Sequence, residues 1–276
     1  MSFKKVLIIL SVVLLLAGCS PSGNDRQPSE KPVLRVGMEC NYAPFNWTTT
    51  TPGATTVAIS SVDYADGLDV VIASLLAEKL GMEVQVVKLD WDNLIPALQH
   101  DQIDAVIAGM TDTADRREVV DFTTPYYVSE EVIIVRKDGG LTGIGSIAEL
   151  AGHKVQGQIN TVYDDIIEQI PGVIHMPAAE TFPAAIQALL AGGIDAVTSE
   201  LPVAIGVTAA NPSLTYVRFT DGSGFSGSQQ DASVSLAVKK GNTELLNSLQ
   251  AALDSISEAD RQQLMLEATD RQPAGE

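Results

Sequence analysis

The sequence is short of positive charge. Of its 276 residues, 17 are Lys or Arg and 35 are Asp or Glu, so the formal net charge is −18. A chain this acidic is repelled by the phosphates of nucleic acids and by anionic lipid head groups. We therefore expect no nucleic-acid partner and no electrostatic docking on an anionic membrane surface.

Residues that carry out catalysis or bind metals are also scarce. The three histidines are His100, His153 and His175, and none of them lies in a turn that we expect to face a cleft. No Ser-His-Asp order, metal-ligand cluster or phosphate-binding loop is present in the sequence. An enzyme needs a titratable acid or base in its cleft. We therefore predict no catalytic residues, no metal site and no cofactor.

The two cysteines point to a membrane anchor rather than to a disulfide. Lys4 and Lys5 precede an apolar run at residues 6–17, which is too short to span a bilayer and is typical of a signal-peptide core. The run ends in Leu-Ala-Gly-Cys at residues 16–19, which resembles a bacterial lipobox. We predict that residues 1–18 are a lipoprotein signal peptide. Cys19 would then carry a lipid such as palmitate and anchor an extracytoplasmic protein to the cell membrane.

An ordinary cleaved signal with a chance cysteine is the alternative to this lipobox. If Cys19 is acylated, Cys40 has no partner within the chain and no disulfide framework exists. Cys40 is then expected to be a small, partly buried residue after a strand. Residues 19–32 are rich in Pro, Ser, Asn and charge, so they predict a flexible tether.

From residue 33 onward, short β-branched runs alternate with helical patterns. This alternation predicts βαβ units and parallel sheets. Residues 48–61 are expected to be a loop or a loose hairpin. The predicted strands are 33–36, 84–89, 103–108, 154–155, 173–175 and 194–198, and the predicted helices are 69–80 (stopped by Gly81), 91–99, 161–169 and 181–191.

One pattern occurs twice with the same spacing. Ala-Leu at residues 97–98 leads through a turn into Ile-Asp-Ala-Val at 103–106, and Ala-Leu at 188–189 leads into Ile-Asp-Ala-Val at 194–197. The repeat predicts two similar α/β lobes, with coincidence of a common pattern as the alternative. Ligands of such sheets lie beyond the carboxyl ends of the strands, here residues 109–111 and 199–200.

Polar residues follow both predicted strand ends. Thr111 precedes a turn and then Arg116 and Arg117, and an Arg can hold a carboxylate through two parallel hydrogen bonds. We expect one of the two to face the cleft and the other to face water, although both can be simply solvated. Thr161 is a candidate N-cap that can also offer its N–H and hydroxyl to an anion.

Glu200 ends a strand that we expect to be buried on both faces. A carboxylate there is unfavourable unless it is paired or open to a cleft, where it can receive an ammonium group; a place on the rim is the alternative. An Arg guanidinium and a Glu carboxylate together can bind the two charged groups of a zwitterion such as a free amino acid. Tyr42, Phe45 and Trp91 can flank its side chain, although each is also a candidate core residue.

From about residue 33 to the C-terminus the chain resembles the extracellular solute-binding proteins of family 3, the polar amino-acid binding components of ABC transporters. The resemblance implies a two-lobe α/β fold of the periplasmic-binding-protein type (type II) that closes on its ligand, each lobe a mixed sheet flanked by helices. It is carried by residues 36–37, 42–45, 67–69, 91–98, 103–111, 116, 121–122, 125–127, 194–197 and 200–204.

The resemblance also implies roles for single residues. Arg116 would bind the α-carboxylate, helped by Thr111 and by Thr161 or the Val162 N–H, while the Gly109 carbonyl and Glu200 would receive the α-ammonium. Tyr42 and Trp91 would enclose the side chain, and Glu39 would lie near its tip. Two residues depart from the family pattern: Glu200 stands where Asp is usual, and Asn160 where Gly is usual.

We expect a protein that binds a free polar amino acid and delivers it to an ABC permease. Glu39 favours a basic ligand (Arg, Lys or His), and Trp91 can add cation–π attraction. A neutral polar ligand such as Gln, which can also bond to Glu39, is the alternative. Lobe 1 is expected to comprise residues 33–128 and 234–276, and lobe 2 residues 129–233, in a monomer. The alternatives are an enzyme on the same fold, such as a periplasmic dehydratase, and a ligand-sensing module.

Overall fold

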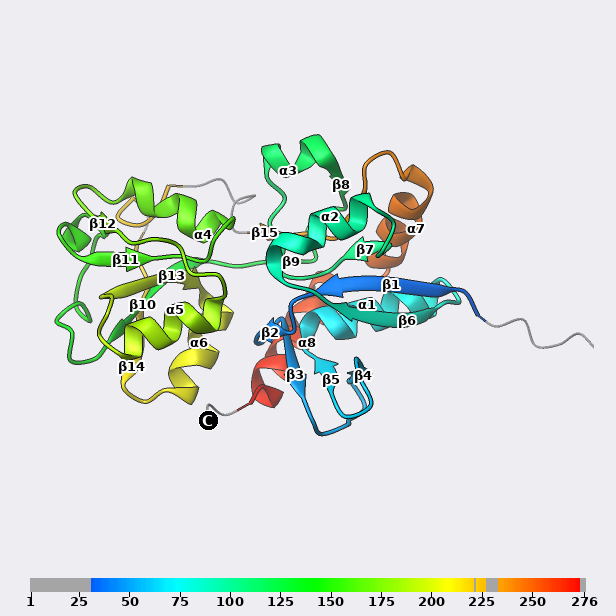
Figure 1. The fold of residues 1–276 in the computed structure, drawn as a ribbon, viewed down its shortest axis with the longest axis horizontal. Coiled ribbons are helices and arrows are strands. Elements are labelled where there is room, and N and C mark those ends of the chain that lie inside the picture. The colour runs from blue at the N-terminus through cyan, green and yellow to red at the C-terminus, as the bar shows by residue number, and fades with distance from the viewer. Residues whose placement is uncertain (1–30, 221, 227–232, 274–276) are drawn as a thin grey trace, which may run out of the picture. The chain divides into compact units, whose positions relative to one another are not determined.

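We describe residues 31–220, 222–226 and 233–273 of a computed structural model of the chain. The first sheet has the strand order β6-β1-β7-β16-β8. Its strands are β1 (Val33–Met38), β6 (Glu83–Lys88), β7 (Ala105–Val106), β8 (Val120–Phe122) and β16 (Ala237–Lys239) (Figure 1). β1 runs parallel to β6 and β7, whereas β16 runs antiparallel to β7 and β8, so the sheet is mixed.

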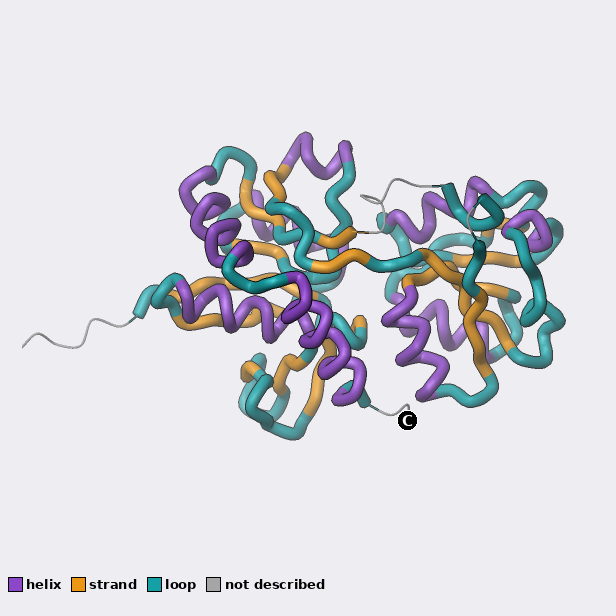
Figure 2. Tube along the Cα trace, turned by 180° about the vertical axis from the view of Figure 1, so that it is seen from behind, coloured by secondary structure: helices purple, strands orange, loops and turns teal. Residues whose placement is uncertain are grey.

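Helices cover both faces of the first sheet, as opposite views show (Figures 1 and 2). Together the sheet and these helices form what we call lobe 1. Its apolar core includes Leu34, Val36 and Met38 of β1, all without solvent exposure. The helices are α1 (Leu68–Lys79), the 3-10 helix η1 (Trp91–Asn93), α2 (Leu94–Gln99), α3 (Ala114–Val119), α7 (Thr243–Asp254) and α8 (Glu258–Arg271).

The second sheet has the order β12-β11-β13-β10-β14 and is also mixed, because β10 runs antiparallel to both of its neighbours. Successive residues of β10 belong to different apolar clusters, so its two faces are both buried. We call this sheet and its helices lobe 2. Its elements are β10 (Glu131–Arg136), η2 (Ile147–Leu150), β11 (Lys154–Gln156), α4 (Val162–Asp165), η3 (Ile166–Gln169), β12 (Ile174–His175), α5 (Phe182–Leu190), β13 (Ala196–Glu200), α6 (Leu201–Ala210) and β14 (Leu214–Val217).

Two smaller sheets complete the fold. One has the order β2-β3-β5-β4 and consists of β2 (Asn41–Tyr42), β3 (Asn46–Thr49), β4 (Val57–Ala58) and β5 (Tyr64–Asp66). The predicted loose hairpin at residues 48–61 therefore contains a strand, β4. The other pairs β9 (Tyr127–Val128) with β15 (Ser233–Val234), and the chain passes between the two large sheets through these two strands.

The repeated Ile-Asp-Ala-Val segments lie in equivalent places. The Asp104 N–H donates to the Arg35 carbonyl at 2.8 Å, and a carboxylate oxygen of Asp104 accepts the Arg35 N–H at 2.8 Å. Asp195 makes the same two bonds with the backbone of Lys154, at 2.8 and 2.9 Å. The aspartate thus joins the start of a central strand to its parallel neighbour in each lobe, which is a physical reason for the repeat.

Element boundaries differ from the predictions in a few places. The α1 helix stops as predicted, with Gly81 at φ 68° donating its N–H to the Glu78 carbonyl. The predicted helix at 91–99 begins as a turn of 3-10 helix, and of the predicted strand at 103–108 only Ala105–Val106 is paired as a strand. The predicted signal peptide, Cys19 and nearly all of the tether lie outside the described residues. No helix in the described ranges is long and apolar enough to span a membrane.

Candidate functional site

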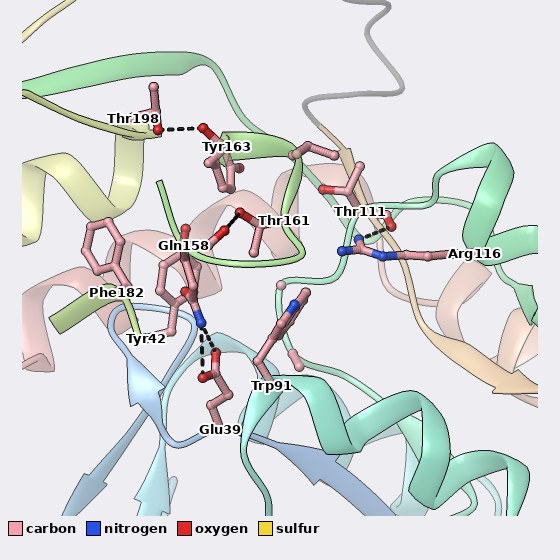
Figure 3. Close-up of a pocket in the computed structure, with 13 residues that line it drawn as sticks. Glu39, Tyr42, Trp91, Thr111, Arg116, Gln158, Thr161, Tyr163, Phe182 and Thr198 are labelled. Atoms are coloured by element: carbon pink, nitrogen blue, oxygen red, sulfur yellow. Dashed lines mark hydrogen bonds between the residues drawn. The ribbon is translucent and has the colours of Figure 1, made fainter. Parts of the chain in front are cut away.

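A cavity lies between the ends of the two large sheets (Figure 3). Lobe 1 and the small sheet contribute one wall, and the turn after β11, α4, α5 and β13 contribute the other. Of the residues that we predicted for the site, all line this cavity except Glu200 and Phe45, which is a fully buried core residue. The lining residues are Glu39, Tyr42, Trp91, Ala108, Gly109, Thr111, Arg116, Gln158, Thr161, Val162, Tyr163, Phe182 and Thr198.

Arg116 supplies the positive charge of the cavity. Its helix, α3, begins at the N-cap Thr113, whose hydroxyl accepts the Arg116 N–H at 3.3 Å. The guanidinium donates to the Thr111 carbonyl at 2.7 Å and lies 5.2 Å from the centre of the Trp91 ring. Burial lowers the pKa of Arg116 to about 10, so the side chain remains a cation at neutral pH.

The neighbouring Arg117 has a different role. It was expected to face water, and its side chain is indeed 55% exposed, but its guanidinium pairs with Asp112, which is only 3% exposed. Arg117 therefore compensates a buried carboxylate, whereas Arg116 lines the cavity.

Thr161 occupies the N-cap position of α4, but its hydroxyl makes no capping bond. The hydroxyl instead donates to the Gln158 carbonyl at 2.7 Å. The predicted N-cap position is therefore confirmed, without a capping bond from the side chain. The bond to Gln158 closes the turn at residues 158–161, which places Thr161 and Val162 in the cavity wall.

Glu39 supplies a carboxylate to the same cavity, directly after β1. It is 6% exposed, and its two oxygens accept bonds from the Gln158 amide at 3.2 and 3.3 Å. Burial raises the pKa of Glu39 to about 7, the Gln158 amide opposes this rise, and the charges of Asp90 and Asp92 add to it. In Figure 3, Glu39 and Arg116 lie on opposite sides of Trp91.

Glu200 is not among the residues that line the cavity, so its predicted contact with the ligand stays a prediction. It is fully buried at the end of β13, where the Tyr42 hydroxyl donates to its Oε1 at 2.8 Å. Burial raises its pKa to about 7. Thr198, two residues earlier on the same face of the strand, lines the cavity instead, because Tyr42 reaches across from lobe 1 and covers Glu200.

Several lining residues were missed from the sequence. Gln158 stands three residues before Thr161 and was not singled out, and Tyr163 and Phe182 stand in helices without a distinctive motif. Thr198 was within reach of sequence reasoning, because side chains two apart on a strand share a face with each other. Within the described ranges, no group of three or more His, Cys, Asp or Glu is arranged to hold a metal ion.

Cys40 is a further correction. It is 2% exposed rather than partly buried, and its φ is +57°. Burial raises the pKa of its thiol to about 12, so the thiol is protonated and unreactive at neutral pH.

Residues 34–267 match the family of bacterial extracellular solute-binding proteins, family 3. The chain belongs to this family. Its fold is the family's two-lobe α/β fold, as predicted. Membership makes it a solute-binding protein and favours the binding function over the enzyme considered from the sequence.

Relatives of this solute-binding protein are named as amino-acid-binding proteins. A putative ABC transporter arginine-binding protein of Escherichia coli is 30% identical over 92% of this chain and 93% of its own length. An arginine-binding extracellular protein of Bacillus subtilis is 33% identical over 59% of this chain, a match that spans 58% of that relative. An L-cystine-binding protein of E. coli is 28% identical over 91% of this chain and 89% of its own length.

Solved structures show the same fold. An amino-acid ABC transporter substrate-binding protein of Streptococcus pneumoniae, bound to L-arginine, superposes with a TM-score of 0.74 at 26% identity. The superposition covers 86% of this chain and 94% of that one.

Direct hydrogen bonds cross the cavity of this solute-binding protein from lobe to lobe. Glu39 with Gln158 and Tyr42 with Glu200 form two of them. The edge of the Tyr42 ring also meets Phe182, with centroids 5.3 Å apart. The two lobes are therefore closed on each other.

Proposed function

We propose that the cavity binds a free basic L-amino acid, with arginine as the best fit. The protein is the substrate-binding component of an amino-acid ABC transporter. The observation that carries the choice of ligand is the placement of Arg116 and Glu39 on the wall of one cavity. An arginine ligand can pair its α-carboxylate with Arg116 and its guanidinium with Glu39.

The α-carboxylate is assigned to Arg116, Thr111 and the turn at Thr161 and Val162. Arg116 is held in place by the Thr111 carbonyl, so its guanidinium is preorganised for a carboxylate. The N–H groups at the start of α4 add donors beside it. An ionised carboxylate held by a charged fork is a strong and directional contact.

The α-ammonium is assigned to the carbonyl of Gly109. This glycine has φ +62°, and its own N–H donates to the Tyr126 hydroxyl at 2.9 Å. We propose that Glu200 acts behind the wall rather than by contact: it holds Tyr42 and adds negative potential near the ammonium.

The ligand side chain is assigned to Glu39, with Gln158 beside it. Glu39 is buried away from water. A guanidinium or ammonium group that pairs with it stabilises its ionised form in place of the lost water. Tyr42, Trp91 and Phe182 flank the path between Arg116 and Glu39. Acidic side chains are disfavoured there, because they would bring a second carboxylate to Glu39.

A thermal-shift screen of the twenty amino acids and L-cystine tests this assignment. A ligand that binds only the folded protein raises its melting temperature. We expect arginine to give the largest rise, lysine and histidine smaller ones, and aspartate and glutamate none. A larger rise with cystine or an acidic amino acid would overturn the proposed ligand class.

Ligand entry requires the lobes to separate, because the direct bonds between them close the cavity. We propose hinge motion at residues 127–129 and near residues 231–233, of which 231 and 232 lie outside the described residues, with residues 33–128 and 234–276 moving against 129–233. Small-angle X-ray scattering checks this: the radius of gyration should fall when arginine is added. An unchanged radius in a sample that binds arginine would contradict the hinge.

We also propose that Cys19 carries the lipid anchor and that the protein delivers its ligand to a membrane permease as a monomer. The support is the lipobox pattern of residues 16–19 after a signal-peptide core. Mass spectrometry of the native N-terminus should find an acylated Cys19, and Cys19→Ser should release the protein from the membrane fraction. An unmodified N-terminus at another residue would rule the anchor out.

A further inference from the structure

Asn160 makes three hydrogen bonds, all of them to lobe 1. It stands in lobe 2, in the turn between β11 and α4. Its carbonyl accepts the Trp91 indole N–H at 3.1 Å and an Arg116 guanidinium N–H at 2.8 Å. Its side-chain amide donates to Asp92 Oδ1 at 2.7 Å. One residue of lobe 2 therefore joins three residues of lobe 1 directly.

The backbone of Asn160 is in the left-handed region, with φ +57°. Asn adopts this conformation more readily than most residues with a side chain. Glycine would adopt it as well but has no amide to give to Asp92. The bond between Asn160 and Asp92 is thus a feature of the side chain, whereas the two bonds to the carbonyl depend on the backbone alone.

We propose that Asn160 is a closure latch, which holds the lobes together through Asp92 and positions Arg116 and Trp91 for the ligand. A contact made only in the closed form shifts the equilibrium between open and closed forms toward closed. It therefore raises the apparent affinity for every ligand that needs the closed form. The latch sets how long a ligand is retained, and Glu39 sets which ligand is retained.

The latch rests on the proposed function in one respect, that the cleft opens and closes around a ligand. Its effect on ligand-free protein does not depend on the identity of that ligand. Scattering from ligand-free protein therefore tests the latch even if arginine fails to bind. If arginine fails to bind but the latch variant is more open than the wild type, the proposed ligand is wrong and the latch stands.

Asn160→Gly is the first test variant, because it keeps the left-handed backbone and removes the amide. Asn160 and Asp92 are both exposed, so we expect their hydrogen bond to stabilise the closed form by no more than an ordinary hydrogen bond does. We expect L-arginine to dissociate about fivefold faster, with the association rate unchanged, in stopped-flow measurements. The ligand-free variant should also have a larger radius of gyration. An unchanged dissociation rate would overturn the latch, since many exposed polar pairs contribute nothing measurable.

An exchange of the two partners separates the latch from a general loss of stability. Asn160→Asp alone places two carboxylates face to face and should speed dissociation more than Asn160→Gly. Combining it with Asp92→Asn rebuilds one hydrogen bond with donor and acceptor exchanged. We expect the double variant to return within about twofold of the wild type, because the coupling between the two residues is restored.

A double variant as fast as Asn160→Asp would show that the two side chains are not coupled, which would overturn the proposal. Asp115→Ala is the matched control. Asp115 is exposed on α3, next to Arg116, so the control removes one negative charge from the same rim. It should leave the dissociation rate unchanged, and a fivefold effect there would assign the result to charge rather than to the latch.

Discussion

The two ends of the cavity differ in how their charges are held. At one end, Arg116 is bonded to the backbone carbonyls of Thr111 and Asn160 and stays a cation across the physiological pH range. At the other end, Glu39 is desolvated and its pKa is raised to about 7, and burial also raises the pKa of Glu200, which lies behind the wall, to about 7. The cationic end is therefore insensitive to pH near neutrality, whereas the acidic end titrates there. The binding of a ligand's carboxylate should therefore not depend on pH near neutrality, whereas the binding of its side-chain cation should.

Arg116→Ala tests the cationic end and should have the largest effect. It leaves the ligand carboxylate unpaired in a closed cavity, so we expect a loss of about 4 kcal/mol in the binding free energy of arginine, measured by calorimetry. Affinity within a factor of two of the wild type would show that Arg116 is not the carboxylate site.

Arg117→Ala is the control for this variant. Arg117 is cationic and adjacent in sequence but pairs with Asp112 instead. The control should bind arginine normally and lose stability toward unfolding, because it leaves a buried carboxylate without its partner.

Glu200→Gln tests the raised pKa of Glu200 through the stability of the fold. The folded pKa of Glu200 is about 7, above its usual 4.5, so the folded protein holds a proton that the unfolded chain releases. The contribution to stability is therefore present below about pH 4.5 and is lost as the pH rises through 7. Between pH 4.5 and 8 the variant should gain about 3 kcal/mol in unfolding free energy relative to the wild type, measured by urea denaturation. Parallel pH profiles would contradict the raised pKa.

Glu39→Gln tests the choice of side chain at the acidic end. We expect arginine to bind about 2 kcal/mol more weakly, since a charge-assisted contact becomes a neutral one. The binding of glutamine should weaken less, so the ratio of the affinities for arginine and glutamine should fall.

The pH dependence of binding should follow Glu39 as well. Because a cation favours ionised Glu39, arginine affinity in the wild type should rise from pH 6 to pH 8 with release of protons. Calorimetry in two buffers of different ionisation enthalpy measures that release, which Glu39→Gln should abolish. Release that persists in the variant would assign it to another group.

Tyr42→Phe should have the smallest effect and would sharpen the distinction between contact and support. It removes the hydroxyl that donates to Glu200 but keeps the ring that packs on Phe45 and Phe182. We expect a loss of about 1 kcal/mol in unfolding free energy by urea denaturation, with the same order of preference among ligands. A change in that order would mean that the hydroxyl itself contacts the ligand.

The comparison between Arg116 and Glu200 also shows how much of the site can be predicted from the sequence. The strand-turn-helix pattern around Thr111 was enough to indicate that one of Arg116 and Arg117 faces the cavity, because such turns are local, and the family resemblance selected Arg116, which lines it. Glu200 was placed correctly at a strand end, but the sequence did not show that it lies behind the cavity wall. Its surroundings depend on Tyr42, which is 158 residues away along the chain and belongs to the other side of the cavity.

The sequence by itself determined the two α/β units and the polar strand ends. These follow from hydrophobic periodicity, a repeated segment and the backbone preferences of single residues, all of which act over short distances. Only the tertiary structure decided that Arg117 pairs with Asp112, that Gln158 meets Glu39 and that Asn160 joins Trp91, Asp92 and Arg116. Those contacts depend on how the two lobes meet, because their partners are brought together by folding and not by spacing along the chain.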